Sequence, residues 1–286
     1  MNSPAVSSVA SSRPDTPATP LSAASPTRLL SANPSRRAAE IFVLGYSPVW
    51  MLAIAVVVLT RAPTGWSDIG HLVLGAGLAL PLYVIPLLRP FAADRDTPWL
   101  ERHITRYGIA IALCTLVQTY FGSALFFDRL GMEYHFHVTW ILNRTPVFLY
   151  FLTLAYFSTY YVLLSLGVRY LRTRFAPSRA ALWLVTALLC YAVAFGETFF
   201  MASDRIRDLF SYRDRQFTLI YGSLCYGTLF LTTLPVFARL DEDSREPARS
   251  TSGARRPWPL LRDTLALNML ALMAYEVCAN WIALKR

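Results

Sequence analysis

Charged residues are scarce in this chain: only 16% of its 286 residues are Asp, Glu, Lys or Arg, and lysine occurs once, at Lys285. Hydrophobic residues make up 55% of the chain, and the mean hydropathy is +0.38. A soluble globular domain rarely has such a composition. The basic residues fall between apolar segments, a pattern that orients a membrane protein and does not indicate nucleic-acid binding. We therefore predict a polytopic membrane protein.

Motifs for metals and cofactors are missing as well. His135 and His137 could share one face of a loop, but no third ligand is evident, so we expect no metal site. The sequence has no phosphate-binding glycine loop, no serine-nucleophile elbow and no haem or flavin signature. Any chemistry is therefore expected to proceed without a cofactor. The cysteines lie in different apolar segments with no close-spaced pair, which favours a packing role: Cys114, Cys190, Cys225 and Cys278.

Seven apolar segments dominate the rest of the chain, each near the length of about 20 residues that crosses a bilayer. None alternates as barrel strands do, which predicts an all-α membrane bundle of about seven transmembrane helices. Residues 1–32 are rich in Ser, Pro and Ala and predict a disordered tail, whereas residues 33–286 predict a single transmembrane domain. The expected spans are Ile41–Leu59, Ile69–Leu88, Tyr107–Phe127, Thr145–Val168, Ala180–Ala202, Phe217–Ala238 and Thr264–Leu284.

Two glutamates lie inside expected spans, where an unpaired carboxylate is costly and marks a functional site. At about 1.5 Å per residue, Glu197 and Glu276 lie roughly 8 and 12 Å below the same membrane boundary. They are the candidate catalytic residues, because two carboxyl groups in an apolar pocket suit proton transfer. Buried hydrogen bonds that only bridge helices are an equally good interpretation from residue type alone.

Aromatic and polar residues are expected at similar depth or in the loop above it. We predict that these residues bind the substrate: Tyr120, Tyr134, Trp140, Asn143, Tyr221 and Tyr226. The charged loop at residues 203–216 could fold over the bundle as a lid, and a simple solvated loop is as compatible with its composition.

Several strings resemble the cycloeucalenol cycloisomerases, which isomerise cyclopropyl sterols. The first is NPSRRAAEIFVLGYSPVW at Asn33–Trp50, and the last is Gly222–Glu242, which ends in ARLDE. The resemblance is collinear over roughly Asn33 to Leu284. The shorter matches between these strings are Ala93–Arg95 with Trp99 and Arg102, Tyr120–Phe121, Phe126–Gly131, Trp140 with Asn143 and Pro146, and Glu197–Thr198.

The resemblance implies a sterol isomerase that opens the 9,19-cyclopropane ring of a cycloeucalenol-type sterol to give a Δ8 sterol. Protonation at carbon 19 and loss of the carbon-8 proton would need one acid and one base, without a cofactor. A sterol double-bond isomerase and a non-enzymatic sterol-binding or transport protein are the alternatives. The implied partners are a sterol or triterpenoid and the lipid bilayer, in a bacterial inner membrane or an endoplasmic reticulum.

The charge distribution predicts a topology. About two thirds of the 27 basic residues lie on the side of the membrane that holds the N-terminus, if seven spans are present. Basic loops remain cytoplasmic, so we expect a cytoplasmic N-terminus and a C-terminus on the opposite side. Reporter fusions at the two ends should therefore report opposite compartments. Reporters on one side would contradict both the span count and the depth argument for the glutamates.

Overall fold

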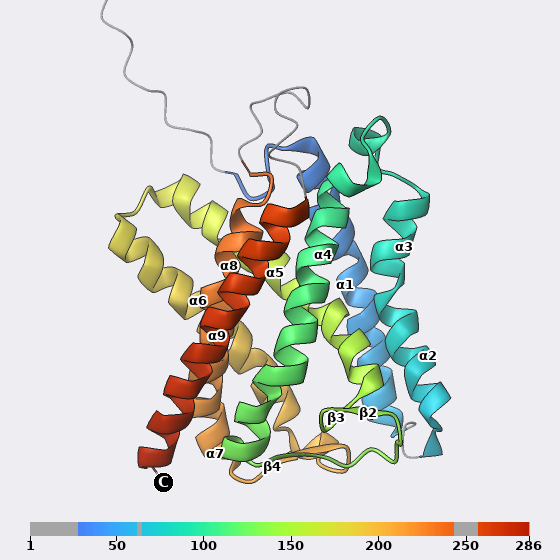
Figure 1. Ribbon diagram of the computed structural model, residues 1–286, viewed down its shortest axis with the longest axis vertical. Coiled ribbons are helices and arrows are strands. Elements are labelled where there is room, and N and C mark those ends of the chain that lie inside the picture. Colours follow the sequence, from blue (N-terminus) through green and yellow to red (C-terminus); the bar gives the residue numbers. More distant parts are fainter. Residues whose placement is uncertain (1–27, 62–64, 243–256, 286) are drawn as a thin grey trace, which may run out of the picture.

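The computed structural model describes residues 28–61, 65–242 and 257–285. Residues 1–27 of the predicted tail lie outside this range, whereas Arg28 and Ser31 contact the bundle: the Arg28 N–H donates to Thr173 and the Ser31 N–H donates to Glu40. Figure 1 shows long helices running side by side between two ends that carry the loops. The long helices and their short companions are α1 (Pro34–Thr60), α2 (Asp68–Ala79), α3 (Pro81–Leu88), α4 (His103–Val117), α5 (Val147–Phe175), α6 (Arg179–Met201), α7 (Arg215–Phe217), α8 (Ser223–Arg239) and α9 (Pro257–Lys285).

Six of the described helical segments are long and apolar enough to cross a membrane, and α2 with α3 forms a seventh span if this bent pair is counted as one. The predicted all-α, multi-pass architecture is thus confirmed. The pair bends by 49° where Pro81, which has no N–H group, begins α3. At this bend the Tyr46 hydroxyl donates to the Leu78 carbonyl oxygen (3.0 Å), which satisfies a backbone group that lipid cannot.

Within the described residues, three helical stretches have the wider π-helical hydrogen bonding. Two of them continue the span that begins with α4, and the third precedes α8. They are η4 (Gln118–Gly122), η5 (Leu125–Leu130) and η7 (Thr218–Gly222). π-helical turns are rare and frequently lie at functional sites.

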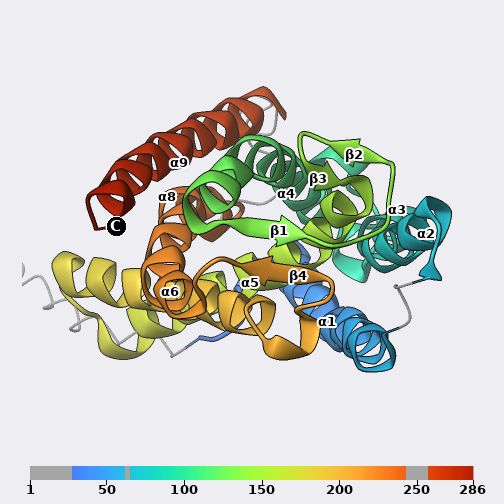
Figure 2. The same cartoon turned by 90° about the horizontal axis from the view of Figure 1, so that it is seen from below.

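The α5 helix lies in the middle of the bundle and contacts α1, α2, α4, α6 and α8. Figure 2 shows this central position from below. Side-chain hydrogen bonds join it to its neighbours: Thr159 bonds Ser47 (2.7 Å) and Trp50 (3.0 Å), and Ser158 bonds Tyr83 (2.8 Å). Such bonds hold helices together where lipid supplies no hydrophobic drive for their association.

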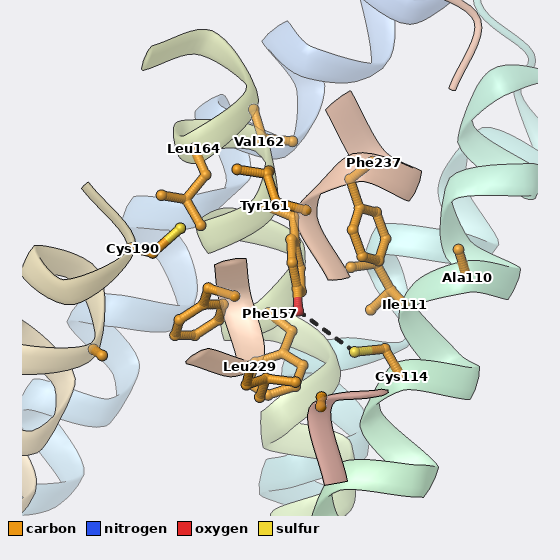
Figure 3. Packing of buried hydrophobic residues seen from close by; sticks show 14 of the residues in the cluster. Ala110, Ile111, Cys114, Phe157, Tyr161, Val162, Leu164, Cys190, Leu229 and Phe237 are labelled. Atoms are coloured by element: carbon orange, nitrogen blue, oxygen red, sulfur yellow. Dashed lines mark hydrogen bonds between the residues drawn. The ribbon is translucent and has the colours of Figure 1, made fainter. Parts of the chain in front are cut away.

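Aromatic packing fills the core around α5. The Tyr161 ring stacks on Phe237 of α8 with their centroids 3.9 Å apart, and its hydroxyl lies 3.5 Å from the Cys114 sulfur (Figure 3). Cys114, Cys190 and Cys225 are buried, and all four cysteines are free thiols. They occupy packing positions, as expected from their spacing.

A buried ionic network holds together the end of the bundle at which α1 begins and α8 ends. Glu40 of α1 accepts from Arg36 (2.9 Å) and from Arg169 of α5 (2.6 Å). Glu242, just beyond α8, pairs with the same two arginines at 3.1 and 2.6 Å. Nearby, Asp241 accepts from His103 and Arg106 of the α4 span; although burial would raise the pKa of this carboxyl, these two groups lower it overall. The network joins α1, α4, α5 and the end of α8.

Removal of one charge from this network should destabilise the bundle. The Glu40→Gln variant leaves Arg36 and Arg169 to share Glu242, and breaking a buried pair in this way costs about 3–5 kcal/mol. We expect a clear drop in the thermal denaturation midpoint of the purified protein in detergent. Asp263→Asn is the control, because its pair with Arg262 is exposed and worth about 0–1 kcal/mol. Equal midpoints for the two variants would contradict the structural importance of the network.

Candidate functional site

A cavity of about 110 Å³ lies at the end of the bundle that holds the C-terminus. Its walls come from η4 and η5, from α5, α6, α8 and α9, and from the strands of the loops that close this end. Its lining is largely aromatic and aliphatic. The polar groups that line it include Gln118, Thr153, Glu197, Tyr226 and Tyr275.

Glu197 is the only acidic residue among the described residues that line this cavity. The Tyr226 hydroxyl donates to its Oε2 atom (2.7 Å). Gly227 brings the two helices together: a Cβ atom at this position would lie 3.3 Å from the Tyr191 Cα atom of α6. The absence of a side chain at Gly227 thus lets α8 approach α6 closely enough for the preceding residue, Tyr226, to reach the carboxyl group.

Aromatic rings surround the carboxyl group. Phe126 packs edge-to-face on Tyr226, with their centroids 5.4 Å apart, and Tyr156 and Tyr212 complete the wall. Tyr212 and Tyr134 lie outside the membrane-spanning helices; burial raises the pKa of both phenols, and the nearby Glu197 adds to this effect. Both side chains therefore remain neutral hydrogen-bonding groups at physiological pH.

A two-stranded cap closes the cavity. Strand β1 (Met132–Tyr134) pairs antiparallel with β4 (Phe210–Tyr212), so that Glu133 lies opposite Ser211. Gly131 begins the cap with a φ of 64°, and a Cβ atom there would lie only 2.7 Å from the Arg213 side chain. The buried cluster under the cap is made of Phe127, Met132, Ile206 and Phe210.

The segment 203–216 is therefore part of the cap and not a freely solvated loop. Its own charges form one exposed pair, Arg215 with Asp204 (3.4 Å), and Asp208 pairs with Arg61 from the neighbouring loop (3.2 Å). A second short hairpin, β2 (Ile141–Leu142) with β3 (Thr145–Pro146), leads into α5.

The structure brings three of the predicted site residues together at the cavity: Glu197, Tyr134 and Tyr226. Tyr120 and Asn143 lie beside each other, because the Asn143 side-chain amide donates to the Tyr120 carbonyl oxygen, but neither lines the cavity. Asn143 has a positive φ of 46° in the hairpin turn.

Three further predicted residues point elsewhere. Trp140 is 46% exposed, and its backbone N–H donates to Asp68 (3.1 Å). Tyr221 packs edge-to-face on Trp281, with their centroids 5.2 Å apart. Glu276 is exposed on α9, in a separate groove that it shares with Arg129. The two candidate glutamates do not share a cavity.

The rotation of α9 explains the position of Glu276. Successive residues of an α-helix differ by about 100° in direction. Tyr275 lies between the cavity and the outer groove and lines both, whereas Glu276, the next residue, lines only the groove. The depth of a residue in the membrane can be estimated from its position along the span. The direction of its side chain depends on which neighbours the helix packs against.

His135 directly follows strand β1 and contacts the opposite strand of the cap. His135 Nε2 lies 2.8 Å from the Ser211 hydroxyl. Within the described ranges, no three His, Cys, Asp or Glu side chains lie close enough to hold a metal ion.

Sequence reasoning missed several polar residues that line the cavity. Gln118, Tyr156, Tyr212 and Tyr275 all line it, and none was among the candidates. Gln118 carried a usable signal, because an amide in the middle of an apolar span needs a partner in the same way as a carboxyl group.

These features define a multi-pass helical membrane protein with an internal, tyrosine-lined cavity that contains one carboxyl group. The chain is 32% identical to the cycloeucalenol cycloisomerase of Arabidopsis thaliana over 228 residues, which cover 78% of this chain and 80% of the plant protein. The chain therefore belongs to the cycloeucalenol cycloisomerase family. No protein-family model matches it, and no solved structure is similar to it.

The pairing of the cap can be tested by cross-linking. Residues directly opposite each other in an antiparallel pair have Cα atoms about 4.5–5.5 Å apart, within the range of a disulfide. We expect the double variant Glu133→Cys/Ser211→Cys to form a disulfide under mild oxidation, detected by mass spectrometry of peptides. Glu133→Cys/Asp208→Cys is the matched control, because Asp208 lies in the same loop but not opposite Glu133. Equal cross-linking in both would argue against a fixed strand register.

Proposed function

We propose that this protein is a sterol isomerase that opens the 9,19-cyclopropane ring of a cycloeucalenol-type sterol and forms a Δ8 sterol. The observation that carries the proposal is Glu197, a carboxyl group held by the Tyr226 hydroxyl in an apolar cavity within the membrane. Membership of the family supplies the class of substrate, because the Arabidopsis relative is a cycloeucalenol cycloisomerase. The carboxyl group and the aromatic wall of the cavity supply the chemical support for this reaction.

The reaction needs a strong, positioned proton donor, because a cyclopropane is a weak base. A carboxylic acid surrounded by apolar groups can hold its proton at neutral pH. In the proposed step, the Glu197 carboxyl group donates its proton to carbon 19. The bond between carbons 9 and 19 breaks, carbon 19 becomes a methyl group, and positive charge develops at carbon 9.

The same carboxylate then completes the reaction. It accepts the proton lost from carbon 8, the electrons of that C–H bond form the double bond between carbons 8 and 9, and Glu197 returns to its acid form. The proton balance of an isomerisation is thus met by one residue. This replaces a two-glutamate mechanism, because Glu276 faces a different groove. The Tyr226 hydroxyl would stabilise the carboxylate between the two transfers.

The aromatic wall suits a cationic intermediate. The faces of the Tyr156 and Tyr212 rings are electron-rich, and such faces stabilise a desolvated cation by roughly 1–2 kcal/mol. The apolar side chains of the cap that line the cavity would limit the access of water to the cation, which water would otherwise capture as an alcohol.

The cavity is smaller than the ligand pockets of about 300–1,000 Å³ that enclose molecules of drug size. Access of a sterol therefore requires outward movement of the cap or of the α6 and α8 helices. Entry directly from the bilayer fits a substrate that partitions into lipid. Under the proposed topology, the cap lies on the non-cytoplasmic side of the membrane.

The decisive variant is Glu197→Gln. Glutamine has nearly the same size and its amide oxygen still accepts from Tyr226, but it cannot donate the required proton. We expect normal accumulation in membranes and a turnover of cycloeucalenol lower by about 10²–10⁴-fold, the usual contribution of a general acid. Glu276→Gln is the matched control and should remain near wild type. The measurement is sterol profiling of membranes that express each variant and are supplied with cycloeucalenol.

Each product identifies a different function. A Δ8 sterol without the cyclopropane supports the proposal. A double bond that moves in a sterol without a cyclopropane would indicate a double-bond isomerase, and binding without conversion would indicate a sterol-binding protein. Near-normal turnover by Glu197→Gln would remove this residue from the chemistry.

A further inference from the structure

Three buried polar atoms at the cavity have no hydrogen-bond partner within the described protein: Gln118 Oε1, Ser123 Oγ and the Tyr275 hydroxyl. Their residues are only 5%, 8% and 4% exposed, and all three line the cavity that contains Glu197. Leaving a buried polar atom unpaired costs about 1–3 kcal/mol. Three such atoms at one cavity indicate a ligand that supplies their partners.

The orientation of Gln118 is fixed by a chain of hydrogen bonds. Its Nε2 atom donates to Asn268 Oδ1 (2.9 Å), and Asn268 Nδ2 in turn donates to the Thr264 carbonyl oxygen (2.8 Å). Because the Asn268 oxygen must accept, Gln118 must present its amide nitrogen to Asn268. The free Gln118 oxygen is therefore an acceptor that needs a donor.

The π-helical turn η4 gathers these groups around Gly122. The Ser123 N–H donates to the Gln118 carbonyl oxygen, so these residues, five apart, stack on one side of the turn. A Cβ atom at Gly122 would lie 2.6 Å from Gln118 Oε1 and 3.1 Å from the Tyr275 ring, so both side chains adjoin this glycine. The missing side chain at Gly122 leaves the space that the Gln118 oxygen occupies.

We propose that Gln118, Ser123 and Tyr275 form an anchor for the hydroxyl group of the substrate. A hydroxyl has one hydrogen to donate and two lone pairs that accept. It can donate to Gln118 Oε1 and accept from Ser123 and Tyr275, which matches the three unpartnered atoms. The inference rests on the proposed function only for the identity of that substrate, a sterol alcohol.

The anchor predicts a specificity. A ketone in place of the carbon-3 hydroxyl can accept but cannot donate, so Gln118 Oε1 would remain unpaired. A methyl ether lacks the hydrogen as well and adds a methyl group that must fit next to Gly122. Sites that hydrogen-bond a hydroxyl reject analogues without it, because their buried polar groups are then left unpaired. The enzyme should therefore require the free alcohol.

The anchor and the acid come from different helices. Gln118 and Ser123 belong to the α4 span and Tyr275 to α9, whereas Glu197 and Tyr226 belong to α6 and α8. A rigid ring system held at its hydroxyl group has few ways to present its other atoms to the carboxyl group. The anchor would thus orient the substrate for the proton transfer.

The test uses Tyr275→Phe and Ser123→Ala in the purified full-length protein in lipid nanodiscs. Binding of cycloeucalenol, its 3-ketone and its 3-deoxy analogue is measured by competition with a labelled sterol. For wild type we expect the alcohol to bind at least 10-fold more tightly than either analogue. Each variant should weaken binding of the alcohol about 5- to 10-fold and leave binding of the 3-deoxy analogue, which has no oxygen to accept from either hydroxyl, within twofold. Tyr221→Phe is the matched control, since Tyr221 does not line the cavity.

Stability separates an anchor from a packing role. The affected hydroxyls have no protein partner, so Tyr275→Phe and Ser123→Ala should denature at the wild-type temperature or above. Equal losses for the alcohol and the 3-deoxy analogue, or no preference of wild type for the alcohol, would overturn the anchor. Preference for the alcohol without any isomerisation would support the anchor and refute the proposed function.

Discussion

The absence of water inside a bilayer is the constraint on which this structure depends. A polar group buried among lipid-facing helices has no water with which to form hydrogen bonds, so it needs a partner in the protein or in a ligand. In the ionic network at the α1 end, Glu40 and Glu242 together meet Arg36 and Arg169. At the cavity end, polar atoms remain without a protein partner. The paired charges thus hold the first end of the bundle together, and the unpartnered atoms that line the cavity are the ones that we propose meet a ligand.

The same constraint explains how much of the fold was predictable. The predicted spans agree with the observed helices because about 20 apolar residues are needed to cross lipid, whatever their neighbours are. The segment predicted as one span over Ile69–Leu88 is divided at Pro81 into α2 and α3, which make a seventh span only if this bent pair is counted as one. Helices extend beyond the apolar segments at several ends, as in α5, where the basic residues after Val168 continue the helix to Phe175.

Contacts between distant segments could not be predicted in the same way. The cap forms because residues 132–134 pair with residues 210–212, and three-residue strands carry no alternation that a sequence pattern can detect. The direction of a side chain was equally hidden, as Glu276 and Tyr275 demonstrate on adjacent positions of α9. Glu197 was found because a carboxyl group in an apolar span is conspicuous. Tyr156 and Tyr212 were missed because tyrosine is common in this chain, which has 15.

The π-helical turn at Gln118–Gly122 is a further reason why hydropathy alone could not define the site. In a regular α-helix, residues five apart point in directions that differ by about 140°, so Gln118 and Ser123 would not share a face. Hydrogen bonding between residues five apart brings them onto one side, as the bond from the Ser123 N–H to the Gln118 carbonyl oxygen demonstrates. A wider turn also forms weaker backbone contacts, and a helix adopts it at some cost in stability. The turn persists where neighbouring groups compensate, here the pairing of Gln118 with Asn268 of α9. The π-helical turn, which weakens the helix, is thus also the feature that turns the side chains of Gln118 and Ser123 toward the cavity.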